Sequence, residues 1–339
     1  MMNNEQFVSL EHKPEIIDKV GTPLSYRPDI KVLDCTIRDG GLVNNFGFED
    51  ETVRALYLAL GEAGVDYMEM GYKASQKIFS PDKFGKWKFS NEEDIRRIIG
   101  DTPNGPKLTV MADAERTDYH TDILPKKDSA IDMIRVATYI HQLPTALEML
   151  KDAVDKGYET AINLMAVSTV NENELEEAIG IFSETDVDVI YLVDSFGSFY
   201  REITRSYVSR YLNHTKKNNK ILGIHAHNNQ QLAFANTIEA LIMGTSFLDT
   251  TVFGLGRGAG NCHTELMLGF LKNPKYHVRP ILKVIDEHIA PLKKIERWGF
   301  DVPYMITGQM NLHPQPAIKY SKAPDISYTE FYDRLLEEE

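Results

Sequence analysis

Short apolar runs alternate with longer amphipathic segments along most of the chain. Segments such as 143–156, 172–182 and 232–243 place apolar residues at helical spacing. Eight apolar runs have the composition of buried strands and cover residues 30–37, 65–71, 107–112, 131–137, 159–167, 188–193, 221–226 and 247–253. A helix between two strands is long enough to make them parallel. The pattern therefore predicts an α/β fold, a closed (β/α)8 TIM barrel with a C-terminal helical extension. An open sheet of six or seven strands is the alternative.

Both ends of the chain lack this alternation. Residues 1–29 are polar and interrupted by prolines and a glycine, which predicts an N-terminal arm. The barrel is expected over residues 30–272. Residues 273–339 are expected to form the extension, including a helix at 280–298 that Pro291 can kink or divide.

Composition narrows the class of protein. Of the 339 residues, 42% are apolar and 26% are charged, which is typical of a soluble globular protein. A net charge of −13 at pH 7 argues against nucleic acid and anionic membrane surfaces as partners. Only two cysteines occur, Cys35 and Cys262, so no disulfide framework is expected and a cytoplasmic setting is the simplest. No signal peptide and no membrane-spanning helix are expected, because the first residues lack a basic segment followed by an apolar one and no run of about 18 apolar residues occurs.

Residues capable of chemistry follow the predicted strands rather than precede them. In a (β/α)8 barrel the active site lies at the carboxyl ends of the strands. The groups at these ends are Arg38 and Asp39, Glu69 to Lys73, Asp113, Ser168, Asp194 and Ser195, His225 to Asn229, and Gly254 to Asn261. The sequence therefore predicts an active site on this rim.

His225 and His227 are the first candidates for a metal site. They lie two residues apart at the end of a predicted strand, so their side chains point to the same side. Asp39 and Asn261 follow the first and eighth strands, which are neighbours of the seventh around the rim. Mixed oxygen and nitrogen ligands suit Mn²⁺, Mg²⁺, Zn²⁺ or Co²⁺ acting as a Lewis acid.

Three motifs, in this order along the chain, resemble the signatures of the DRE-TIM metallolyases. They are DCTIRDG (34–40), HAHN (225–228) and GLGRGAGN (254–261). This superfamily includes the 4-hydroxy-2-oxovalerate aldolases, hydroxymethylglutaryl-CoA lyase, and the isopropylmalate, citramalate and homocitrate synthases. The resemblance covers about residues 30 to 270 and looks closest to the aldolases of the HMGL-like branch.

The resemblance implies a bound divalent ion, with Mn²⁺ as the first choice, and a small 2-oxo acid as the substrate. The ligands it implies are Asp39, His225, His227 and, in the lyase branch, Asn261. It also implies that Arg38 binds the carboxylate and the enolate oxygen of the substrate. The substrate-binding residues we expect are Arg38, Ser195, Gly256 and Arg257. A guanidinium suits this role because it stays charged at pH 7 and presents a planar fork to a carboxylate.

The chain departs from the aldolases at one position. Those enzymes carry a catalytic histidine three residues after the aspartate ligand, where this chain has Leu42. An aliphatic side chain cannot move a proton, so the base must come from elsewhere. Tyr72 and Lys73 are the first candidates, because they follow the second strand. The other candidates are Glu69, Tyr139, His141 and His263.

Two segments beyond the motifs invite a functional interpretation. The loop 73–89 carries five lysines and four aromatic residues in an otherwise acidic chain. It is expected to be a positive patch, a mobile lid or a subunit contact, unless it is only a solvated loop. The segment 307–314 could fold back over the barrel mouth by a non-helical path, or simply pack on the barrel.

The leading functional hypothesis is a metal-dependent aldolase that acts on a 4-hydroxy-2-oxo acid through a pyruvate-type enolate. The alternative is a Claisen-type acyl-CoA condensing synthase of the isopropylmalate or citramalate type, which Arg257 slightly favours. A second alternative is a metal-binding barrel without lyase activity, because the expected base is missing. An apolar set in the C-terminal helices is compatible with a homodimer.

Overall fold

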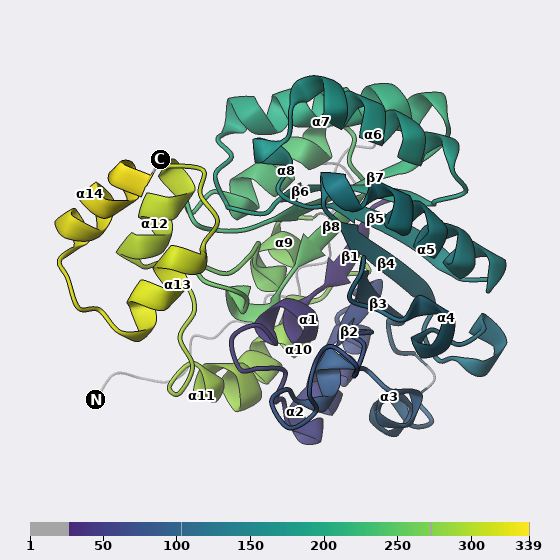
Figure 1. Ribbon diagram of the computed structural model, residues 1–339. Helices are drawn as coiled ribbons and strands as arrows, with labels where there is room; N and C mark the ends of the chain where they lie inside the picture. Colours follow the sequence, from purple (N-terminus) through teal and green to yellow (C-terminus); the bar gives the residue numbers. More distant parts are fainter. Residues whose placement is uncertain (1–26, 103, 272, 339) are drawn as a thin grey trace, which may run out of the picture.

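The barrel is closed and all its strands are parallel. The computed structural model describes residues 27–102, 104–271 and 273–338, so most of the predicted arm lies outside the described residues. The strands are β1 Lys31–Asp34, β2 Tyr67–Tyr72, β3 Lys107–Asp113, β4 Met133–Thr138, β5 Glu159–Leu164, β6 Val189–Asp194, β7 Ile221–Ala226 and β8 Phe247–Thr250. They pair in chain order, and β8 pairs with β1 (Figure 1). This topology confirms the (β/α)8 TIM barrel and rules out the open sheet.

Helices surround the strands, and further helices follow the barrel at the C-terminus. They are α1 Thr36–Gly40, α2 Asp50–Glu62, α3 Glu92–Ile99, α4 Tyr119–Asp122, α5 Leu143–Asp155, α6 Glu172–Glu184, α7 Arg201–Lys217, α8 Ala233–Met243, α9 Thr264–Phe270, α10 Val278–Val284, α11 Ala290–Leu292, α12 Val302–Gln309, α13 Gln315–Lys322 and α14 Tyr328–Glu338. Helix α10 packs against α2 and α9, beside the seam where β8 meets β1. No helix in the described ranges is long and apolar enough to cross a membrane.

The barrel interior has an apolar floor below a charged layer. Strand residues alternate between the two faces, and the inward set includes the buried Leu33, Tyr67 and Phe247. Two residues further along β2 and β8, the inward positions are Glu69 and Asp249, both buried. The apolar floor therefore carries charged groups just below the rim where the candidate ligands lie.

Strand β1 is shorter than predicted, because the chain turns into α1 directly after Asp34. The Asp34 carboxylate accepts hydrogen bonds from the Thr36 backbone N–H (3.0 Å) and hydroxyl (2.9 Å), which starts the turn. Arg38 and Asp39 therefore lie on a single helical turn rather than on the end of a strand. Strands β5 and β8 also end three residues earlier than predicted, because short 3₁₀ turns begin at residues 167 and 252.

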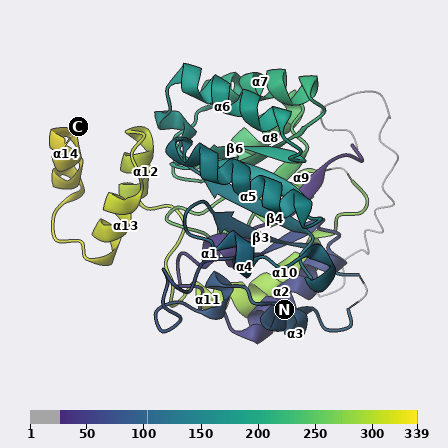
Figure 2. The same cartoon turned by 45° about the vertical axis from the view of Figure 1, so that its right-hand side comes forward.

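The C-terminal helices form a lobe beside the barrel. Helices α12–α14 share a small apolar cluster that also includes Ala259 of the barrel, and they lie to one side of the barrel in both views (Figures 1 and 2). The helix predicted at 280–298 instead ends at Leu292, after a π-helical segment, Ile285–Ile289, that leads into Pro291. Since proline has no N–H to donate, its presence in α11 disturbs the ordinary helical ladder.

The segment 307–314 folds back over the barrel mouth, which confirms the first of the two paths predicted for it. Residues 307–309 still belong to α12, and a non-helical turn follows. The Asn311 side chain donates to the Ser168 carbonyl (3.2 Å) and accepts from the Ser198 hydroxyl (2.8 Å). Both serines follow carboxyl ends of barrel strands, so this contact fixes the segment at the rim.

The lysine-rich loop is packed rather than freely charged. Four of its five lysines are engaged: Lys73 with the Ser90 carbonyl, Lys77 with Asp118, Lys86 with Asp50, and Lys88 with the rings of Phe46, Tyr72, Phe79 and Phe84. The Lys88 ammonium lies 4.2 Å from the centre of the Tyr72 ring, and its side chain is buried. The loop therefore does not present the free positive patch that its composition suggested.

Candidate active site

Three buried side chains converge at the carboxyl rim of the barrel. Asp39 comes from α1, His225 from β7, and His227 from the residue after β7. The Nε2 atoms of His227 and His225 lie 3.4 and 3.6 Å from Asp39 Oδ2. One potential ligand atom from each residue lies within 4.8 Å of the others, a spacing that suits a single ion between them.

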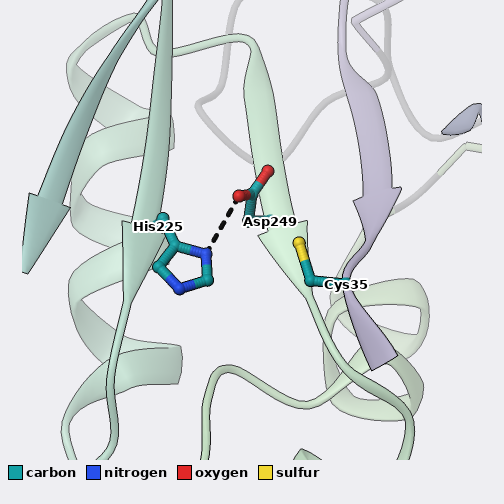
Figure 3. Close-up of side chains that lie close together, drawn as sticks. All are labelled: Cys35, His225 and Asp249. Atoms are coloured by element: carbon teal, nitrogen blue, oxygen red, sulfur yellow. Dashed lines mark hydrogen bonds and ion pairs between the residues drawn. The ribbon is translucent and has the colours of Figure 1, made fainter. Parts of the chain in front are cut away.

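Hydrogen bonds at Nδ1 hold both imidazoles in place. His225 Nδ1 lies 2.9 Å from Asp249 Oδ2 on the neighbouring strand β8, and Figure 3 shows the two side chains facing each other. His227 Nδ1 lies 3.0 Å from the Asp194 carbonyl oxygen. A carboxylate and a carbonyl accept protons, so each Nδ1 is the protonated nitrogen and each Nε2 keeps its lone pair. This is the orientation that a metal-binding histidine needs.

Asn261 completes the cluster. Its amide nitrogen donates to Asp39 Oδ2 (2.5 Å), and Asn261 forms an isolated bridge with His227. Within the described ranges, Asp39 Oδ1, His225 Nε2 and Asn261 Oδ1 are buried without a hydrogen-bond partner. Asp39 Oδ1 still has the Arg38 ion pair at 3.5 Å, whereas His225 Nε2 and the Asn261 amide oxygen have no hydrogen-bond partner. A divalent cation beside Asp39 Oδ2 would use the free lone pair of His225 Nε2, so Asp39 and the two histidines fit the ion that the resemblance implies.

Gly256 allows Asn261 to come this close. A Cβ atom at residue 256 would lie 2.1 Å from the Asn261 amide nitrogen and 3.2 Å from Asp39 Oδ2. Any larger residue would therefore displace the amide from the carboxylate. Gly256 therefore leaves the space in which the Asn261 amide reaches Asp39.

The electrostatic surroundings favour the protonation states that a metal site requires at Asp39 and His227. At His225, burial alone would lower the pKa, but the contacts with Asp249 and Asp39 outweigh burial and raise it. Burial alone would raise the pKa of Asp39, but the Arg38 charge and the adjacent His225 and His227 imidazoles outweigh it and hold that pKa well below its usual value. Burial outweighs the opposing effect of the contacts with Asp39 and lowers the pKa of His227 to about 4. Asp39 is therefore an anion and His227 a neutral imidazole near pH 7.

A chain of buried ion pairs connects the two sides of the site. Arg38 Nε donates to Glu69 (2.7 Å), and Glu69 also pairs with Arg135 (3.1 Å). Arg135 in turn donates to Asp249 (2.5 Å), the residue that holds His225. Removing one partner of a buried pair costs roughly 3–5 kcal/mol, so this chain restricts both Arg38 and His225 to one position.

Cys35 lies beside Asp249 but adds no second metal site. Cys35, His225 and Asp249 lie close enough together to suggest one (Figure 3). However, Arg135 occupies the Asp249 carboxylate, and burial, followed by the nearby carboxylates, raises the pKa of the Cys35 thiol. A metal-binding cysteine must be a thiolate. Asp249 therefore serves to orient His225.

A cavity of about 70 Å³ opens over the cluster. The predicted site residues that line it are Arg38, Asp39, Tyr72, Ser195, His225, His227 and Arg257. The lining residues that sequence reasoning did not place there include Asn163, Phe196 and His313. Leu42, which replaces the expected histidine, also lines the cavity. The position of the missing base thus faces the site and is aliphatic.

Of the two leading candidates for the base, only Tyr72 reaches the cavity. Lys73 points to the opposite side of β2, where its ammonium donates to the Ser90 carbonyl (2.7 Å). Glu69 faces inward, so strict alternation would turn Tyr72 outward, but a register irregularity between Glu69 and Tyr72 reverses the order and turns Tyr72 to the mouth. Burial, followed by Asp113, raises the pKa of the Tyr72 hydroxyl, which makes it a hydrogen-bond donor rather than a base.

Of the other four candidates for the base, only Tyr139 lines the cavity. Tyr139 lines the cavity, and His141 stacks on its ring at 5.7 Å without lining the cavity. His263 lies beside Glu265 (3.0 Å) and also lies outside the lining. Glu69 is held by Arg38 and Arg135.

Sequence reasoning did not identify Asp249 and Arg135. Each is a single charged residue in an otherwise apolar strand, at a position that alternation turns inward. A charged side chain that points into a barrel needs a partner of opposite charge. This requirement could have identified both residues as candidates from the sequence. His313 belongs to the segment 307–314 that the sequence placed over the mouth as one of two paths, but no chemistry was assigned to it, because its position depends on how the C-terminal lobe packs.

Replacing Asp249 with Asn is expected to weaken Mn²⁺ binding by roughly 10–100-fold, because His225 loses the carboxylate that fixes its Nδ1 proton. Calorimetric titration of the metal-free protein would measure this. The matched control is Asp188→Asn, which changes a carboxylate that binds the Thr160 backbone (2.8 Å) at the opposite end of the barrel. Equal Mn²⁺ affinity in both variants and the unaltered protein would show that Asp249 does not support the site.

Comparisons with known proteins agree with this geometry. The HMGL-like family matches residues 29–287. The oxaloacetate decarboxylase of Mycobacterium tuberculosis is 31% identical over 245 residues, which cover 71% of this chain and 69% of that protein. A 4-hydroxy-2-oxovalerate aldolase of Pelotomaculum thermopropionicum is 29% identical over 263 residues, covering 76% and 75%. The N-terminal domain of a candidate aldolase from Bacteroides vulgatus superposes with a TM-score of 0.75 at 28% identity, covering 87% of this chain and 97% of that one.

The fold and these similarities define the class of protein as a TIM-barrel enzyme of the lyase and aldolase type. Within that class, the chain belongs to the HMGL-like family. The resemblance to the DRE-TIM metallolyases is thereby confirmed.

Proposed function

We propose that this protein is a divalent-metal-dependent carbon–carbon lyase that cleaves a 4-hydroxy-2-oxo acid to a pyruvate-type enolate and an aldehyde. The observation that carries the proposal is the convergence of potential ligand atoms of Asp39, His225 and His227 beside Arg38, with His225 Nε2 buried and unpaired. Asp39, His225, His227 and Asn261 would hold the ion, with Mn²⁺ as our first choice. The ion would polarise the keto oxygen of the substrate as a Lewis acid.

Arg38 is placed to bind the substrate carboxylate and to stabilise the negative charge that develops on oxygen as the bond breaks. Burial alone would lower its pKa, but Glu69 and Asp39 outweigh this and raise it, so Arg38 remains charged. Its bond to Glu69 fixes the guanidinium plane, and the group lines the cavity. The Tyr72 hydroxyl is a second donor at the same cavity.

A second candidate reaction is decarboxylation of a 2-oxo acid that carries a carboxylate on C3. Aldol cleavage needs a group to take the proton of the C4 hydroxyl, and Leu42 cannot do so. Loss of carbon dioxide breaks a carbon–carbon bond and leaves the same enolate without that deprotonation. The similarity to a protein named oxaloacetate decarboxylase also favours this candidate.

The first test is Mn²⁺ binding combined with deuterium exchange at the methyl group of pyruvate. Metal-dependent exchange is expected from a protein that stabilises the pyruvate enolate. A protein that binds Mn²⁺ without exchanging pyruvate, but releases thiol from acetyl-CoA, would contradict the proposal and indicate the condensing reaction. Absence of Mn²⁺ binding would also refute it.

The proposed setting is the reducing cytosol, and both cysteines are buried and unpaired. We also propose a homodimer. It is supported by an exposed apolar row on α14, formed by Tyr328, Tyr332 and Leu336 at helical spacing.

A further inference from the structure

Arg257 brings a second guanidinium to the cavity, and its charge is not balanced by an acid. Its Nη2 donates to the Ser195 carbonyl oxygen (2.7 Å), and its buried Nε has no partner. Arg38 pairs with Asp39 and Glu69, whereas Arg257 forms no ion pair with a carboxylate in the part of the chain that the structure describes. A half-buried cation with a free donor at a substrate cavity is a ready site for an anion.

His313 lines the same cavity from the C-terminal lobe. Its Nδ1 accepts the backbone N–H of Gln315 (3.1 Å), so the neutral ring carries its proton on Nε2. Partial burial and the nearby Arg257 charge both lower the pKa of His313, which keeps the ring neutral at pH 7. The Phe196 ring lies edge-on to His313 at 5.7 Å and lines the cavity with it. His313 is therefore a neutral donor beside Arg257 at the exposed edge of the cavity.

The charges around the cavity call for a substrate with two negative charges. The buried network below the rim contains Arg38, Arg135, Asp39, Glu69 and Asp249. Two arginines against three carboxylates leave one excess negative charge. A divalent ion, bound by histidines in their neutral form, would turn this into one positive charge, and Arg257 adds a second. A monoanionic substrate would leave the half-buried Arg257 without a carboxylate partner, whereas a second carboxylate would pair with it.

We propose that Arg257 and His313 form a subsite for a second carboxylate, so that the substrate is a 2-oxo acid with a distal carboxylate. This inference rests on the proposed function, which assigns the first carboxylate to Arg38. The cavity of about 70 Å³ is small, which fits a compact dicarboxylate better than a long or bulky distal group.

The test compares two ligands of equal length that the enzyme need not turn over. The unreactive probes are 2-oxoglutarate and 2-oxovalerate, which differ by a carboxylate in place of a terminal methyl group. Calorimetric titration of the Mn²⁺-loaded full chain should show that 2-oxoglutarate binds roughly 10- to 100-fold more tightly. Arg257→Gln should remove most of this preference. His313→Gln should reduce it by a smaller factor.

A matched control separates a specific subsite from a general effect of charge. Arg116→Gln removes one exposed arginine just after β3, outside the cavity lining, and should keep the preference. Equal binding of the two ligands to the unaltered protein would refute the subsite. An equal loss of preference in the Arg257 and Arg116 variants would also refute it. Mn²⁺ binding and pyruvate exchange test the proposed function, and the comparison of the two ligands tests the subsite. Failure of the subsite can therefore be distinguished from failure of the proposed function.

Discussion

Replacing Asp39 with Asn is expected to abolish Mn²⁺ binding while the barrel still folds. Asp39 supplies the carboxylate of the proposed ligand set, and it lies within 3.4 to 3.6 Å of the two histidine nitrogens. An amide carries no charge to offset the ion. The loss should exceed the roughly 10–100-fold that follows removal of a ligand's hydrogen-bond partner. His225→Ala should have the same effect, because it removes a nitrogen ligand.

The measurement is calorimetric titration with Mn²⁺, together with circular dichroism to establish folding. The matched control is Asp132→Asn, which alters a carboxylate that binds the Leu108 backbone (2.9 Å) at the start of strand β3, away from the rim. The control should bind Mn²⁺ like the unaltered protein. Undiminished Mn²⁺ binding in both the Asp39 and His225 variants would overturn the assignment of the site.

Much of the fold could be predicted because the barrel repeats a simple physical pattern. Eight apolar runs separated by amphipathic helices leave few arrangements other than a closed parallel barrel. The rule that parallel strands point their carboxyl ends to one rim then brings Asp39 and His225 together, although 185 positions separate them. The sequence motifs and the predicted topology together were sufficient to predict that Asp39 and His225 lie close together.

The other residues of the site could not be placed from the pattern of apolar and polar positions, because their positions depend on tertiary structure. Lys73 was misplaced because a register irregularity in β2 between Glu69 and Tyr72 turns Tyr72, and not Lys73, to the cavity. The pairing of Arg135 with Asp249 joins strands that lie far apart in the sequence, so only the closed barrel brings the two charges together. His313 reaches the cavity because the turn after α12 bonds to the rim, which is a matter of tertiary packing.

Replacing Arg38 with Gln is expected to lower kcat by roughly 10²–10³-fold while Mn²⁺ binding persists. Arg38 pairs with Asp39 through Nη1 (3.5 Å) but is not in the proposed ligand set, so its removal should affect the reaction far more than the ion. The charge that Arg38 stabilises develops as the bond breaks, so kcat should fall, and because Arg38 also binds the substrate carboxylate, KM should rise as well.

Arg38→Lys makes this prediction sharper. Lysine keeps a positive charge but has no Nε to donate to Glu69, so the group loses its fixed orientation. We expect the Lys variant to recover only a small part of the lost kcat, since orientation contributes in addition to charge. The matched control, Arg54→Gln, removes an exposed arginine that binds the Ile98 carbonyl (2.6 Å) and should retain full activity. If Arg38→Gln left kcat unchanged with Mn²⁺ bound, the charge developing in the reaction would have to be stabilised without this guanidinium, and the proposed role of Arg38 would be wrong.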